Sequence, residues 1–142
     1  MEVREIMSRD VRIAGIGETL SDAAAAMADE DVGALPVSDR GKLVGMITDR
    51  DIVVRAVALG RSPSETVVGD VMSEEALYCF EDEDVEEAAR NMSELKIRRL
   101  PVLNRAKRLV GILALADVAR HVDTPDAGEV LQDISAPGDG PG

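Results

Sequence analysis

Thr48 and Asp51 are the residues whose types and spacing most directly suggest chemistry in this sequence. They close the stretch G-M-I-T-D-R-D (45–51), in which a short apolar run leads into a hydroxyl and then a carboxylate. A carboxylate can accept hydrogen bonds from two adjacent hydroxyl groups, and bonds to a charged group contribute about 1.5 to 3 kcal/mol each. Free N–H groups at a helix start also favour an anion near Thr48. The pair can therefore hold a ligand.

The same two residues fit a second role that requires no ligand. A Thr followed three residues later by an acid resembles a capping box, in which each side chain accepts a hydrogen bond from the other residue's backbone N–H. Such a cap stabilises a helix by about 1 kcal/mol. The two roles are compatible, so the motif alone leaves both open.

A basic segment runs from Lys96 to Arg108. Six of its thirteen residues are Lys or Arg and none is acidic, although the formal net charge of the chain is −12. Because salt screens exposed charges beyond about 8 Å, a local cluster can attract an anion in an acidic protein. The same charges would also protect a strand edge from pairing with another strand. Both interpretations remain open at this point.

The composition disfavours several classes of function. The net charge opposes binding to nucleic acids and anionic membranes, and Tyr78 and Phe80 are the only aromatic residues available for stacking on bases. Cys79 and His121 are each the single residue of their type. We therefore expect no disulfide within the chain, no metal site and no catalytic residues, and we expect the protein not to be an enzyme.

The sequence gives no sign of a membrane segment. The N-terminus lacks the apolar core of a signal peptide, and the apolar stretch from Ala23 to Ala28 is far too short to cross a bilayer. A cytoplasmic location is expected.

The chain repeats itself. Residues 3–57 align with residues 68–122, with one extra residue near Arg108 in the second copy. Two copies are too few for a solenoid and favour a pair related by a pseudo-two-fold axis. The expected organisation is repeat 1 at 1–60, a linker at 61–67, repeat 2 at 68–122 and an acidic Pro/Gly tail at 123–142, frayed apart from a turn at 129–134. The identical pairs include Met7 and Met72, Pro36 and Pro101, Gly45 and Gly111, and Asp51 and Asp117.

Each copy predicts the same elements, in the order of an α+β fold. Leu20, Ala23, Ala24 and Met27 fall at helical spacing and predict the buried face of an amphipathic helix. Thr19 and Asp84 are the expected caps of this helix in the two copies. The remaining elements are a helical turn (3–8 and 68–73), a first strand (11–14 and 76–80), two paired strands (34–37 with 43–47, and 100–103 with 109–113) and a closing helix (49–59 and 115–122).

The run from Ala23 to Ala26 is apolar at consecutive positions, unlike its counterpart in the second copy. A helix that is apolar on more than one face is usually buried on more than one face. A close contact between helices of a homodimer is therefore expected, and a solvated face rich in strong helix formers is the alternative.

Four motifs in order carry a family resemblance: D-V-G-A-L-P-V (31–37), V-G-M-I-T-D-R-D-I (44–52), I-R-R-L-P-V (97–102) and L-V-G-I-L-A-L-A-D-V (109–118). With them the chain resembles the CBS-domain pair, or Bateman module, and in particular the small stand-alone pairs of the hypoxic-response type. The resemblance implies two βαββα repeats packed as a pseudo-two-fold pair. It also implies two clefts for adenosine-containing ligands such as AMP, ADP, ATP or S-adenosylmethionine, with no other cofactor required.

Carried over residue by residue, the resemblance places Asp51 on the ribose and Thr48 near the phosphate. Arg98 and Arg99 from the second copy would clamp the phosphate. The residues expected around the base are Ala76, Leu77, Ile97 and Pro101, with Met46 nearby.

The second cleft departs from the family pattern. Asp117 is kept, but Ala114 replaces the hydroxyl, and Gly33 and Ala34 stand where the two arginines would be. This cleft is expected to be weak or empty. The leading hypothesis is thus a regulatory protein that senses one adenine nucleotide per chain, as a homodimer. The alternative is a ligand-free structural or stress protein that acts through its dimer surface or its acidic tail. An unknown protein partner is possible under either hypothesis.

Overall fold

The computed structural model describes residues 1–121, so the expected tail and its turn lie outside the described residues. Within residues 1–121 the chain forms two three-stranded sheets, ordered β1-β2-β3 and β4-β5-β6, each with one parallel and one antiparallel pair of strands. This confirms the α+β class. The elements are β1 (Ala14–Gly15), α1 (Leu20–Glu30), β2 (Ala34–Asp39), β3 (Lys42–Thr48), α2 (Asp49–Arg55), β4 (Cys79–Phe80), α3 (Val85–Leu95), β5 (Arg99–Leu103), β6 (Leu109–Ala114) and α4 (Leu115–His121), with 3₁₀ helices at Val3–Glu5, Val57–Leu59 and Val68–Asp70.

Two compact units divide the chain differently from the sequence repeats. The first-repeat unit is Arg12–Ala76, and the second-repeat unit combines Met1–Val11 with the chain from Leu77 onward. Each unit therefore contains the β-α-β-β-α elements of one repeat together with the short segment that begins the other repeat, 68–76 in the first-repeat unit and 1–11 in the second-repeat unit.

We call these two short segments, 1–11 and 68–76, the exchanged segments. Backbone hydrogen bonds hold each of them in its unit. In the second-repeat unit, Ser8 and Ile112 donate to one another's carbonyl oxygens at 2.8 and 2.9 Å, and Val3 is fully buried. In the first-repeat unit, Met46 and Ser73 exchange the same pair of bonds at 2.9 Å each. The exchanged segments are thus integral to the cores of the two units.

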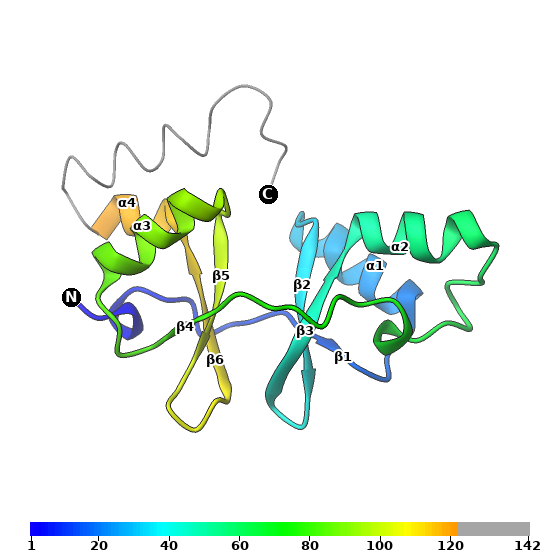
Figure 1. Ribbon diagram of the computed structural model, residues 1–142, viewed down its shortest axis with the longest axis horizontal. Helices are drawn as coiled ribbons and strands as arrows, with labels where there is room; N and C mark the ends of the chain where they lie inside the picture. The colour runs from blue at the N-terminus through cyan, green and yellow to red at the C-terminus, as the bar shows by residue number, and fades with distance from the viewer. Residues whose placement is uncertain (122–142) are drawn as a thin grey trace. The chain divides into compact units, whose positions relative to one another are not determined.

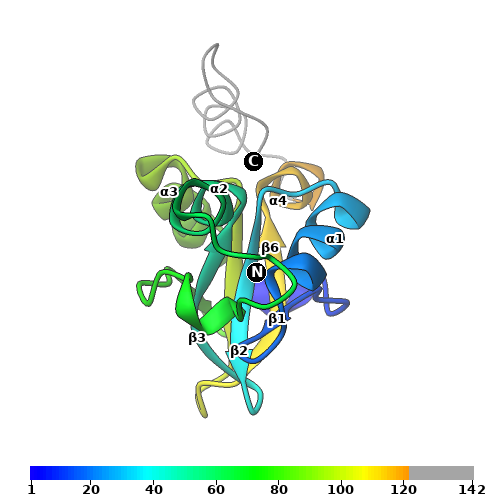
Figure 2. The ribbon, with the colours of Figure 1, turned by 90° about the vertical axis from the view of Figure 1, so that its right-hand side faces the viewer.

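Helices α1 and α2 lie on the same side of the β2–β3 hairpin (Figures 1 and 2). Leu20, Ala23 and Met27 are buried as predicted, but Ala24 is exposed and Ala26 is buried instead. Ala26 belongs to the same apolar cluster as Ile52 of α2, so the buried face of α1 is turned toward α2. Ala26 is thus covered within its own unit, whereas Ala24 and Ala25 of the same run are exposed, and the expected contact across a homodimer stays a prediction.

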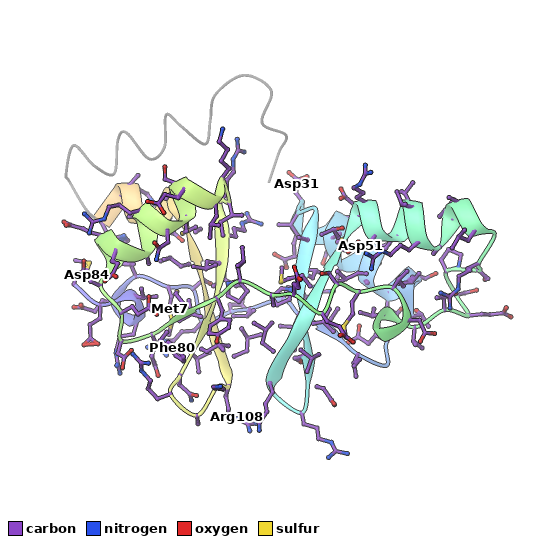
Figure 3. The ribbon with its side chains drawn as sticks, viewed as in Figure 1. Met7, Asp31, Asp51, Phe80, Asp84 and Arg108 are labelled. Carbon is purple, nitrogen blue, oxygen red and sulfur yellow. The ribbon has the colours of Figure 1, made fainter. Side chains whose placement is uncertain are left out.

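Helix α3 packs its predicted apolar face into the second-repeat unit, but its N-terminus is capped in an unexpected way. Asp84, labelled in Figure 3, makes no side-chain capping bond. The Val85 N–H instead donates to the Met1 carbonyl at 2.9 Å, and the Asp84 carboxylate lies 3.7 Å from the N-terminal ammonium. The predicted Asp84 cap is therefore wrong. The bond to Met1 does not account for its absence, because the Leu20 N–H of α1 donates to the Thr66 carbonyl in the same way at 2.9 Å. In α1, by contrast, the predicted Thr19 cap is confirmed, because its hydroxyl accepts the Asp22 N–H at 3.2 Å.

The first-repeat hairpin turns at Arg40–Gly41, where both residues have positive φ (55° and 82°). A two-residue turn of this kind requires the left-handed region, which glycine adopts without strain. Asp39 and Lys42 pair directly across the turn, so the two strands reach beyond the predicted ranges 34–37 and 43–47.

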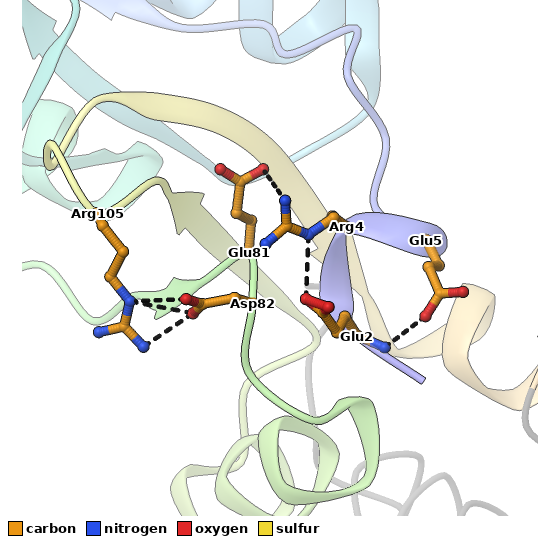
Figure 4. Close-up of polar contacts among 6 residues, drawn as sticks. All are labelled: Glu2, Arg4, Glu5, Glu81, Asp82 and Arg105. Atoms are coloured by element: carbon orange, nitrogen blue, oxygen red, sulfur yellow. Dashed lines mark hydrogen bonds and ion pairs between the residues drawn. The ribbon is translucent and has the colours of Figure 1, made fainter.

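A charged cluster stabilises the surface of the second-repeat unit. Arg105 makes a two-pronged contact with Asp82, through Nε to Oδ2 at 2.9 Å and Nη2 to Oδ1 at 2.8 Å (Figure 4). The Arg105 guanidinium also lies 4.1 Å from the centre of the Phe80 ring. The hydrogen bond from Arg105 holds the pKa of Asp82 below its usual range. The aligned positions of the first repeat are Gly15 and Gly17, so this cluster is specific to the second.

The lowered pKa gives Arg105 a pH-dependent contribution to stability. Because Asp82 stays ionised to lower pH in the folded chain than in the unfolded one, the pair stabilises the protein fully above the ordinary aspartate pKa. This stabilisation is lost as the pH falls through the folded pKa of Asp82. We expect the difference in free energy of unfolding between the natural protein and Arg105→Met to shrink in strong acid, as measured by urea denaturation across a pH series. A difference that is unchanged by acid would contradict the prediction.

None of the helices within residues 1–121 combines the length and the hydropathy needed to cross a membrane.

Candidate functional site

Thr48 and Asp51 meet at the junction of β3 and α2. Strand β3 ends at Thr48, which has extended backbone angles, and α2 begins at the next residue. The Thr48 hydroxyl accepts the Asp51 N–H at 3.0 Å, and Asp51 Oδ2 accepts the Thr48 N–H at 3.1 Å. The capping-box interpretation is confirmed. Asp51, labelled in Figure 3, is largely buried, with 16% of its side chain exposed.

The cap does not exhaust the hydrogen-bonding capacity of the pair. A hydroxyl that accepts one bond still has its own proton to donate, and an ionised carboxylate has about four acceptor positions. Oδ1 of Asp51 takes no part in the capping box. The pair can therefore cap the helix and at the same time offer a donor and an acceptor to a ligand.

Arg55 is a further charged residue at this site, and our interpretation of the sequence missed it. Its Nε lies 3.9 Å from Asp51 Oδ1, and its Nη1 donates to the carbonyl oxygens of Val71 at 3.3 Å and Met72 at 3.4 Å. The signal was present, because an acid and an arginine four residues apart are neighbours on one helix face.

The equivalent junction of the second repeat differs in each of these contacts. Ala114 has no hydroxyl, so a Thr–Asp capping box is not formed there. Asp117 forms an ion pair with Arg120 within α4. His121 occupies the position that aligns with Arg55, and its Nδ1 lies 3.1 Å from the Asp117 carbonyl oxygen. This junction therefore lacks the donor that Thr48 provides.

Arg98 and Arg99 precede and begin β5 in the second-repeat unit. Arg99 is exposed and is paired in the sheet with Ala114, while the Arg98 carbonyl accepts the Leu115 N–H at 2.9 Å. In the first-repeat unit the same places are taken by Ala34, opposite Thr48, and by Gly33, whose carbonyl accepts the Asp49 N–H at 2.9 Å. The hydroxyl–carboxylate pair and the arginine pair thus belong to different units.

The residues predicted to surround a base are also divided between the units. Met46 and Ala76 are half-buried in the first-repeat unit. In the second-repeat unit Pro101 is buried, Ile97 is half-buried and Leu77 is 51% exposed. The joining of these residues with Thr48 and Asp51 into one binding site stays a prediction.

Cys79 does not offer a reactive thiol. Burial, with a smaller contribution from Glu83, raises its pKa to about 12. The thiolate is the nucleophilic form of cysteine, so this side chain is inert at neutral pH. Among residues 1–121, His, Cys, Asp and Glu side chains form no group of three that could hold a metal ion.

Known proteins share this fold and sequence. A family model described as "CBS domain" matches residues 3–57 and again residues 68–124. Hypoxic response protein 1 of Mycobacterium tuberculosis is 37% identical over 135 residues, a match that covers 94% of both chains. Such a match leaves no room in that relative for a separate catalytic domain.

Solved structures give the same result. The crystal structure of Hypoxic Response Protein I, with two coordinated zinc ions, has a TM-score of 0.74 and 39% identity, covering 86% of this chain and 99% of that one. CBSX2 in complex with AMP has a TM-score of 0.70 and 29% identity, with 84% and 93% covered.

The CBS domain pair of protein MJ0100, in complex with 5′-methylthioadenosine and S-adenosyl-L-methionine, has a TM-score of 0.67 and 30% identity, with 84% and 98% covered. The duplicated β-α-β-β-α elements, the duplicated motifs and these matches agree: the chain belongs to the CBS-domain family and carries two copies of the domain in tandem.

Proposed function

We propose that the protein is a regulatory CBS-domain pair that binds one adenosine-containing ligand per chain, such as AMP, ADP, ATP or S-adenosylmethionine. Asp51 accepts the ribose hydroxyls and Thr48 donates to a phosphate or other acceptor. Met46, Ala76, Leu77, Ile97 and Pro101 contact the base. Binding changes the shape or the partner affinity of the protein rather than catalysing a reaction.

The observation that carries this proposal is the unused capacity of the Thr48–Asp51 capping box. The Thr48 hydroxyl keeps its proton, and Asp51 Oδ1 lies outside the box. Two related CBS pairs have been solved with adenosine compounds, which supports an adenosine ligand for this chain. Asp117, without a neighbouring hydroxyl, provides at most a weak second site.

Arg98 and Arg99 supply the positive charge for an anionic ligand. Arginine forms planar, two-pronged hydrogen bonds to phosphate, and its guanidinium stays charged at any physiological pH. These residues come from the repeat that lacks the hydroxyl, so the proposal requires both repeats to contribute to one ligand.

A second candidate function is docking of a protein, including a second copy of this chain. Four large apolar side chains on α2 and the 3₁₀ helix after it are exposed: Val53, Val54, Val57 and Leu59, at 46 to 72%. A cluster of this kind is typical of an interaction surface. It adds an apolar surface to the exposed Ala24 and Ala25 of α1 for the proposed homodimer, and it is compatible with a protein that binds no nucleotide.

Isothermal titration calorimetry of the full chain with AMP, ATP and S-adenosylmethionine tests the proposal. We expect saturable binding of at least one of the three, with one ligand per chain. Heats equal to those of buffer for all three compounds would overturn the proposal and favour the docking function.

A further inference from the structure

Arg55 contacts two parts of the first-repeat unit that are distant in sequence. Its Nε approaches Asp51 Oδ1 at 3.9 Å, and its Nη1 donates to the Val71 and Met72 carbonyls at 3.3 and 3.4 Å. A guanidinium has five N–H donors in a fixed plane, so one arginine can hold a carboxylate and two carbonyls together.

The two carbonyls belong to the exchanged segment that completes the first-repeat unit. Directly after them, Ser73 exchanges two backbone hydrogen bonds with Met46 of β3. The chain then leaves this unit after Ala76. A change in how Arg55 holds the Val71 and Met72 carbonyls therefore acts on the segment through which the chain passes to the second-repeat unit.

Asp51 Oδ1 is the oxygen on which Arg55 and the proposed ligand converge. Oδ2 is held by the Thr48 N–H, so ribose hydroxyls would donate mainly to Oδ1, the oxygen nearest Arg55. Hydroxyl donors on Oδ1 would weaken the attraction between this oxygen and the arginine, whose Nε lies 3.9 Å away, beyond hydrogen-bond distance. The guanidinium could then turn its donors more fully toward the Val71 and Met72 carbonyls, which Nη1 already contacts.

We propose that Arg55 is a positioning residue that couples occupation of Asp51 by an adenosine ligand to the Val71–Ser73 segment. This inference rests on the proposed function. It is specific to the first repeat, because His121 stands in the place of Arg55 in the second and contacts the Asp117 carbonyl rather than its carboxylate.

Amide hydrogen exchange of the full chain, with and without saturating AMP, tests the coupling. In the natural protein AMP should slow exchange of the Ser73 N–H by about fivefold, the change expected for about one additional net hydrogen bond. Arg55→Met, which keeps the length of the side chain and its helix propensity, should still bind AMP by calorimetry but lose this change. Arg55→Lys should restore part of it, since it keeps the charge without the planar fork.

Arg61→Met is the matched control. Arg61 pairs with Asp70 at 3.4 Å, just before the same segment, rather than with Asp51. Its removal should leave the AMP effect at Ser73 intact. If Arg55→Met binds AMP and shows the full slowing at Ser73, the coupling is overturned while the proposed function stands. If AMP, ATP and S-adenosylmethionine all give no binding heat with the natural protein, both are overturned.

Discussion

Gly45→Ala should destabilise the first-repeat unit by about 3 kcal/mol. A Cβ atom at this position would overlap the carbonyl oxygen of Ser73 and lie 3.1 Å from Met72 Sδ. That carbonyl cannot withdraw without breaking the pair of hydrogen bonds between Met46 and Ser73. A glycine is therefore required at position 45, because the backbone of the exchanged segment at Ser73 lies directly against the backbone of β3. Urea denaturation followed by circular dichroism measures the change.

Two other glycines serve as comparisons. At Gly111 an added Cβ would meet the flexible Met7 Sδ at 2.6 Å and the Ser8 carbonyl oxygen at 2.8 Å, so Gly111→Ala should be costly but less so than Gly45→Ala. At Gly17 an added Cβ would have open space within 4 Å, and this glycine has no positive φ. Gly17→Ala should change stability by less than about 1 kcal/mol. Equal denaturation midpoints for Gly45→Ala and Gly17→Ala would contradict the close crossing.

Asp51→Asn should weaken AMP binding by about 100-fold, whereas Asp117→Asn should change it by less than about threefold. The estimate for Asp51 corresponds to losing the charge behind two hydrogen bonds from ribose hydroxyls. Asparagine keeps an oxygen that can accept the Thr48 N–H, so α2 retains its cap. Calorimetry gives the two dissociation constants, and urea denaturation verifies that both variants remain folded.

Comparing the Asp51 and Asp117 variants shows which of the two repeats supplies the carboxylate that holds the ligand. The two residues stand at the same place in α2 and α4, in the first turn of each helix. If Asp117→Asn removes binding and Asp51→Asn does not, the ligand is held in the second cleft, at Asp117, instead.

The repeat and its helices and strands could be predicted from the sequence because they depend on local patterns. Helical spacing predicted most of the α1 and α3 buried faces, and the predicted pairing of 34–37 with 43–47 is present in the β2–β3 hairpin. The sequence alone could not tell whether Ala24 or Ala26 is buried, because α1 is apolar at consecutive positions. The packing of α1 against α2 buries Ala26 and leaves Ala24 exposed.

The exchange of segments between the units could not be predicted in the same way. The pattern around Val3 and Val68 shows that each residue is buried, but it does not identify the unit that buries it. The Val3 and Val68 N–H groups donate to the carbonyls of Glu83 and Glu18, which lie 80 and 50 positions away in the chain, and local spacing does not relate residues so far apart.

The capping box of the candidate site could be predicted from the spacing of Thr48 and Asp51, and the structure confirms it. The proximity of Arg55 to Asp51 could also have been predicted, from their spacing of four residues on one helix. The contacts of Arg55 with Val71 and Met72 could not, because backbone carbonyls leave no mark in a sequence.

The proposed function depends on the hydroxyl–carboxylate pair of the first repeat as the place where the ligand is held. A crystal structure of the protein grown with AMP would show whether that pair is occupied. We expect one AMP per chain, with its ribose hydroxyls on Asp51 and its phosphate within reach of Thr48, Arg98 or Arg99. AMP bound at Asp117 with nothing at Asp51 would contradict this proposal.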